Sequence, residues 1–80
     1  MKFKNIKTEI AFDGRFVNPP ESAYRASGSM DCIYECIRED GEWYCIVTQY
    51  GQEEESPSNF DTLRECKDWA ERQNTYLAGI

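Results

Sequence analysis

The four cysteines are the residues whose chemistry depends most on where the fold places them. They are Cys32, Cys36, Cys45 and Cys66, and each can be a free thiol, half of a disulfide or a metal ligand. On one strand, Cys32 and Cys36 would share a face but stand about 13 Å apart. Zinc binds sulfur at about 2.3 Å, so these two cannot share one ion, and the C-x2-C pairs of strong zinc signatures are missing. We therefore expect no metal and no cofactor, with cysteine as a small core residue.

Cys36 and Cys45 are the one pair that the sequence predicts to meet. Asp40-Gly41 favours a two-residue hairpin turn, and a hairpin centred there places residues 36 and 45 opposite each other. They would form a non-hydrogen-bonded pair, in which cross-strand side chains come closest. A cross-strand disulfide can therefore form on oxidation, although the cytosol keeps thiols reduced.

Histidine is absent from the chain. Its absence removes the usual general base near neutral pH, the Cys-His and Ser-His nucleophile pairs, and the commonest metal ligand. Nothing in the sequence assembles lysine or carboxylate groups in its place. We expect no catalytic residues and a protein that is not an enzyme.

Acidic residues are concentrated in the middle of the chain. The net charge is −6 overall, and residues 31–61 alone hold nine acids against one arginine, a charge of −8. Too few lysines and arginines cluster for direct nucleic-acid binding, and the acids lack the spacing of a calcium loop. They form either a solvated edge or a negative patch that docks on a basic protein. The candidate partner-binding acids are Glu39, Asp40, Glu42, Glu53, Glu54 and Glu55.

The hairpin of residues 31–39 and 42–50 is the strongest structural signal. Both of its faces are substantially apolar, so we expect it at the centre of a sheet. Upstream, residues 3–12 alternate in the manner of a strand, and Asp13-Gly14 predicts a turn into a short strand over residues 15–17. Prolines end that strand. Residues 21–30 are predicted as a small-residue connection and 51–58 as a polar loop.

The C-terminal segment predicts a helix from about residue 63 to residue 74. Thr62 to Glu65 fits a capping box, with threonine as the N-cap, and an apolar stripe follows at helical spacing. The stripe consists of Leu63, Cys66, Trp69, Ala70, Gln73 and Leu77. We expect a single α+β domain over residues 1–80, in which this helix packs on one face of a three- to four-stranded antiparallel sheet.

One helix cannot cover both faces of the hairpin, so we expect one face to expose aromatic residues. They would be Tyr34 and Trp43 beside Arg38, or Tyr44 and its neighbours. Trp, Tyr and Arg are enriched at interface hot spots. Trp43 is accordingly a predicted anchor for a partner, next to the acids of the hairpin tip. The alternative is a structural or regulatory homodimer that pairs through the open face, its acids serving only solubility.

The second half of the chain resembles a known class in its layout. A hairpin strand from Gly41-Glu42-Trp43-Tyr44, a loop, and a capped helix over Asn59 to Trp69 are similar to small acidic proteins of phages and mobile elements, including several anti-CRISPR proteins. The resemblance carries no functional residue over. It implies an inhibitor that occludes a nucleic-acid-binding surface on a host defence complex, such as a CRISPR effector.

The first residues carry positive charge without an apolar segment behind them, unlike a signal peptide. No apolar run approaches the roughly 18 residues that span a bilayer. We therefore expect a cytoplasmic protein, in the host cytoplasm if a phage encodes it.

Overall fold

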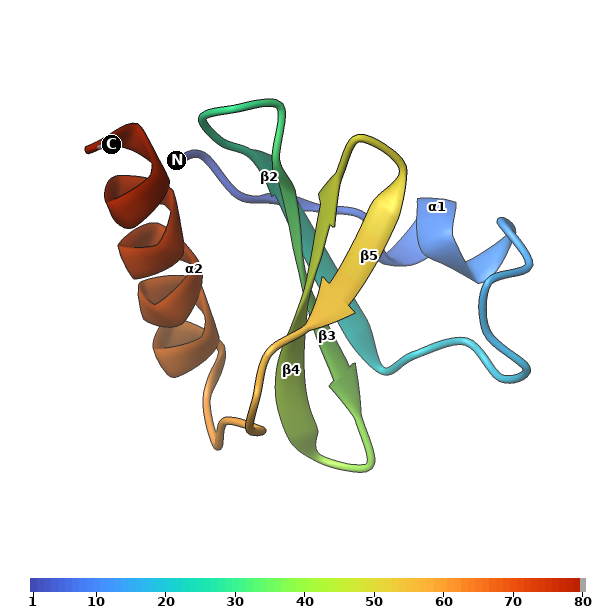
Figure 1. Cartoon of the computed structure of the whole chain (residues 1–80). Coiled ribbons are helices and arrows are strands. Elements are labelled where there is room, and N and C mark those ends of the chain that lie inside the picture. The colour runs from blue at the N-terminus through green and yellow to red at the C-terminus, as the bar shows by residue number, and fades with distance from the viewer. Residues whose placement is uncertain (80) are drawn as a thin grey trace.

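Five antiparallel strands, each hydrogen-bonded to the next one in the chain, form a sheet with a C-terminal helix packed on it (Figure 1). The computed structural model describes residues 1–79. The α+β class and the packed helix are confirmed, and the sheet has more strands than the three or four predicted. The elements are β1 (Lys4–Asn5), α1 (Lys7–Ala11), β2 (Ser22–Ser27), β3 (Ile33–Glu39), β4 (Glu42–Gln49), β5 (Gln52–Glu55) and α2 (Leu63–Ala78).

The central hairpin of β3 and β4 has the predicted register. Cys36 pairs with Cys45, and Arg38 pairs with Trp43. Asp40 and Gly41 both have positive φ, 53° and 79°, which is the backbone that a type I′ turn requires. The turn therefore fixes which residues of β3 and β4 share a face.

The N-terminal prediction of a strand over residues 3–12 is wrong. Only Lys4 and Asn5 pair with β2, and the chain then turns into the short helix α1. Ile6 and Ile10 are both buried because residues four apart lie on the same side of a helix. Residues four apart also lie on the same face of a strand, so in a short segment this spacing does not distinguish the two. The expected strand over residues 15–17 is likewise a series of bends.

Two segments predicted as connections are strands. Residues 22–27 form β2, in which Ala23 and Ala26 are buried, because strand pairing on both sides outweighs the weak β-propensity of small residues. Residues 52–55 form β5, which follows a second tight turn at Tyr50 and Gly51. Its glutamates suit an edge strand, where charge discourages further pairing.

Both faces of the sheet are covered, so the expectation of an open aromatic face is wrong. Figure 1 shows α2 on one side of the sheet and α1 on the other. The α2 side holds the larger core, which includes the buried residues Cys32, Tyr34, Cys36, Trp43, Cys45, Cys66 and Ala70. The α1 side holds a smaller core of Ile6, Ile10, Ala23, Ile37 and Ile46, with Phe16 and Tyr44 packed against it.

Helix α2 begins as the capping box predicts and runs further than expected, to Ala78. The Glu65 backbone N–H donates to the Thr62 hydroxyl oxygen at 3.2 Å. Cys66 and Ala70 are fully buried against the sheet, which confirms the apolar stripe. Within the described chain, no helix is both long and apolar enough to cross a membrane.

Candidate functional site

Two of the three acids at the tip of the hairpin have a side-chain hydrogen-bond partner. The Tyr44 hydroxyl donates to Glu39, and the Asn59 side-chain amide donates to Glu42 at 2.9 Å. Asp40 is exposed and forms no salt bridge or side-chain hydrogen bond with residues 1–79. The tip therefore offers one carboxylate without a polar side-chain partner.

The three glutamates of β5 point to two faces of the sheet. Glu54 pairs with Val47 of the α2 face, whereas Glu53 and Glu55 lie on the α1 face. Glu53 forms a salt bridge of 2.9 Å with Arg15. Glu54 and Glu55 are exposed and form no salt bridge in the part of the chain that the structure describes.

The two acidic clusters predicted to act together are well separated. Glu42 begins β4, and Glu53 pairs with Thr48 near the other end of that strand. Six strand residues span about 20 Å. The acids thus form two sites along one hairpin, and a small partner surface meets only one of them.

Trp43, predicted as an exposed anchor, is only 7 % exposed. It lies on the sheet face that α2 covers, where its ring is 6.2 Å from that of Tyr24. Phe60 also pairs with it through two backbone hydrogen bonds, at 2.9 and 2.7 Å. Trp43 therefore stabilises the core and is not accessible to a partner.

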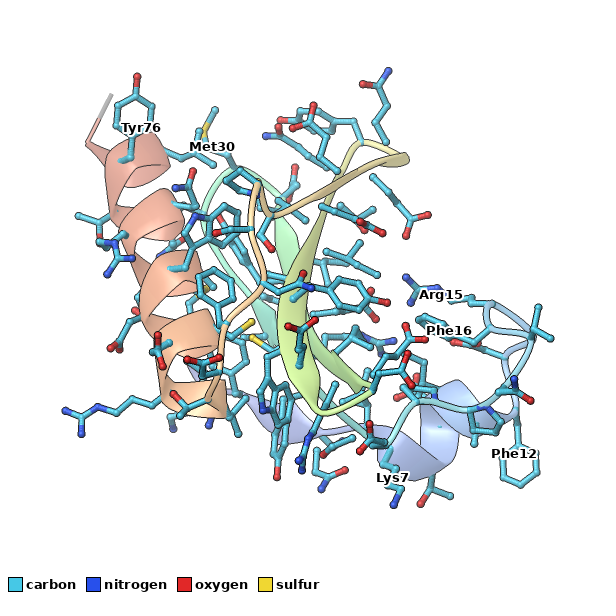
Figure 2. The ribbon with its side chains drawn as sticks, turned by 90° about the horizontal axis from the view of Figure 1, so that it is seen from below. Lys7, Phe12, Arg15, Phe16, Met30 and Tyr76 are labelled. Atoms are coloured by element: carbon cyan, nitrogen blue, oxygen red, sulfur yellow. The ribbon has the colours of Figure 1, made fainter. Side chains whose placement is uncertain are left out.

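A cleft between α2 and the edge of the sheet offers the exposed aromatic surface instead. Its volume is about 470 Å³. Tyr76, at the C-terminal end of α2 in Figure 2, is 69 % exposed. The lining residues are Cys32, Tyr34, Val47, Gln49, Glu54, Glu55, Pro57, Trp69, Gln73, Tyr76 and Leu77. The cleft thus combines an apolar helix wall with the carboxylate of Glu54 on β5.

One polar group in the wall of the cleft is unsatisfied. The Tyr34 hydroxyl is buried and has no hydrogen-bond partner among the described residues. Burial raises the pKa of Tyr34 to about 12, so the hydroxyl is protonated near neutral pH and can donate. Buried polar groups nearly always have a partner, so this hydroxyl is an exception in the core of the protein.

A buried carboxylate on the α1 face went unrecognised in the sequence. Glu35 is 2 % exposed. Both of its oxygens accept from Arg15 Nη1, at 2.9 and 2.8 Å, and one accepts from Arg25 Nε and Nη2, at 3.1 and 2.9 Å. Burial alone would lower the pKa of each arginine, and the hydrogen bonds to Glu35 and its neighbours raise it above the usual value.

The charged groups around Glu35 form a chain across that face. Arg25 also binds Glu9 of α1 at 3.0 Å, and Arg15 binds Glu53 of β5 at 2.9 Å. Figure 2 shows Arg15 and Phe16 reaching toward the sheet and Phe12 pointing away from it. These contacts hold α1 and the loop after it against the sheet. The sequence signal was a glutamate between Ile33 and Ile37 on one strand face.

Three of the four cysteines meet in the core. Cys36 and Cys45 face each other as predicted, and Cys66 of α2 joins them, so that the three sulfur atoms lie within 4.8 Å of one another. All three are fully buried, and all four cysteines are free thiols. Cys32 is also buried but stands outside this group.

Contacts within the group shift the thiol pKa values in opposite directions. Contacts with Cys36 and Cys45 lower the pKa of Cys66, against the effect of burial. Contacts with Cys45 and Cys66, together with burial, raise the pKa of Cys36.

Comparisons with protein-family models, curated proteins and solved structures gave no match for this chain.

Proposed function

We propose that this chain is a non-enzymatic inhibitor that binds a partner protein through the cleft between α2 and β5. The observation that carries the proposal is the position of Glu54, an exposed carboxylate without a salt bridge among the described residues, on the rim of a cleft lined by Trp69 and Tyr76. The aromatic wall supplies apolar area, and the rim supplies charge. A partner that fits presents lysine or arginine beside an apolar side chain.

Each part of the cleft contributes differently to binding. Aromatic anchors in a desolvated pocket supply most of the affinity of typical interfaces. Rim carboxylates mainly raise the association rate and select a partner of opposite charge. Binding should therefore weaken as salt rises, without vanishing.

We propose a nucleic-acid-handling protein as the partner. Such proteins cluster lysine and arginine to bind phosphates, and carboxylates can occupy those groups in place of nucleic acid. The resemblance of the second half of the chain to phage-encoded inhibitors of the anti-CRISPR type, drawn from its sequence, leads us to propose a host defence complex as the target. The chain itself, at a net charge of −6, is repelled by nucleic acid.

A homodimer through an open sheet face is not proposed, because no observation favours it. The face expected to be open carries α1 and its own small core. The exposed edge strand β5 carries three glutamates in a row, and identical edges of this kind repel each other.

A charge-matched pair of variants tests the proposal. The chain is used as bait in a pull-down from lysate at low and high salt, and captured proteins are compared among wild type, Glu54→Gln and Asp40→Asn. Both variants change the net charge by +1. We expect the β5 variant to lose a salt-sensitive partner that the hairpin-tip variant retains.

Two further measurements complete the test. Tyr76→Ala should weaken capture of the same partner at both salt concentrations, because it removes apolar area. Added single-stranded DNA should compete with the chain for that partner. Equal loss in the two charge variants, or loss only at the hairpin tip, would show that the cleft is not the docking site.

A further inference from the structure

We propose that Cys36, Cys45 and Cys66 form a three-sulfur site for one soft, thiophilic metal ion of the Cu(I) type. The sequence alone predicted no metal, because two cysteines four residues apart on one strand are too far apart to bind the same ion. The fold supplies that position by placing one sulfur on each of β3, β4 and α2. The inference is independent of the proposed docking function.

The geometry of the three sulfurs suits a small ion. Sulfurs about 2.3 Å from an ion at their centre stand about 4 Å apart. The three thiols already lie within 4.8 Å of one another, so closing on an ion requires shifts of less than about 1 Å. Cys36 and Cys45 are held in register by the strand ladder. Such rigid elements position ligands more accurately than loops do.

The donor set selects the class of ion. The group contains sulfur alone, and the chain has no histidine to complete it. Structural zinc sites are almost always four-coordinate, and calcium and magnesium require oxygen ligands. Thiolates favour soft ions such as Cu(I). Three sulfurs in a dry core therefore match a soft ion that accepts three ligands.

Binding of the ion releases protons. Each thiol that binds as a thiolate releases one proton to solvent, and no electron is transferred. The resulting complex is anionic.

Binding at this site would also stabilise the fold. A chain of this size buries a thin core, and small domains often depend on a metal or disulfide. The ion would join α2 to the central hairpin, two elements that otherwise meet through side-chain packing. Because the three sulfurs are fully buried, we expect slow loading of the native protein and fast loading during refolding.

The test is an anaerobic titration of the reduced full chain with Cu(I) against a colorimetric Cu(I) chelator. We expect one equivalent to bind, an ultraviolet thiolate-to-copper absorption to appear, and the Tm to rise. Cys36→Ala, Cys45→Ala and Cys66→Ala should each lose the bound equivalent. Cys32→Ala is the matched control, because Cys32 is equally buried and outside the group, and it should bind as wild type does.

Two further measurements use wild-type protein, so the proposal can be tested even if a variant fails to fold. In mild denaturant, bound Cu(I) should slow alkylation of the three clustered cysteines more than that of Cys32, as read by mass spectrometry. Arsenite, which condenses with three thiols to a neutral product and three waters, should bind one equivalent. Arsenite binding without Cu(I) binding, tighter binding of Zn(II) than of Cu(I), or equal loss in Cys32→Ala would each overturn the proposal.

Discussion

At the residue scale, the polar groups inside this small protein are few, and each has a distinct setting. Glu35 is buried but paired twice, the Tyr34 hydroxyl is buried and unpaired among the described residues, and the three clustered thiols lie within 4.8 Å of one another. Buried charge is tolerated only when it is paired and hydrogen-bonded. Glu35 meets that condition through two arginines that arrive from different segments.

Replacing Glu35 tests how much that network contributes to the fold. Glu35→Gln should lower the free energy of unfolding by about 2 kcal/mol. This loss is smaller than that of a fully buried ion pair, because both arginines are partly exposed to solvent. The loop that carries Arg15 should also become more accessible, which limited proteolysis or hydrogen exchange measures. Glu53→Gln breaks only the exposed contact to Arg15 and should cost less than about 1 kcal/mol. Equal effects of the two variants would contradict the network.

At the element scale, β3, β4 and α2 could be predicted because local chemistry specifies them. Asp40-Gly41 selects a two-residue turn, and Thr62 with Glu65 selects a helix start. β2 and β5 were missed because their residues have weak strand propensity and their pairing comes from neighbouring strands. The cleft and the three-cysteine group were missed because they join segments distant in the chain.

The start of α2 carries a prediction of its own. Thr62→Ala removes the hydroxyl that accepts from the Glu65 N–H, and it should lower the free energy of unfolding by about 1 kcal/mol. Thr75 lies exposed within the same helix, so Thr75→Ala is the control. It should leave stability unchanged or raise it slightly, because alanine is the better helix former. Urea unfolding of both variants gives the comparison.

At the scale of the whole molecule, the fold is a sheet covered unequally on its two faces. Helix α2 covers the larger core and leaves a cleft at the β5 edge, whereas α1 and its loop cover the other face through a few apolar contacts and an ion network. The sequence predicted the sign of the charged surface but not its division into two sites. That division follows from the length of β4, which separates the hairpin tip from β5.

The response of the whole protein to alkaline pH depends on Tyr34. Burial raises its pKa from 10.0 to about 12, so the folded state holds this proton more tightly than the unfolded state does. Its contribution to stability is therefore fully present below pH 10 and is lost as the pH rises from about 10 to about 12. Tyr34→Phe should flatten the pH dependence of the unfolding free energy in that window. Urea unfolding at several pH values, compared with wild type, measures the difference.

The control is Tyr50→Phe. Tyr50 is 73 % exposed, so this substitution removes a tyrosine hydroxyl outside the core. It should leave the pH dependence as in wild type, and the four cysteines are common to all three proteins. Below pH 10, Tyr34→Phe should equal or exceed wild type in stability, since it removes a buried hydroxyl that has no partner in residues 1–79. A loss of stability there would show that the hydroxyl is hydrogen-bonded in solution.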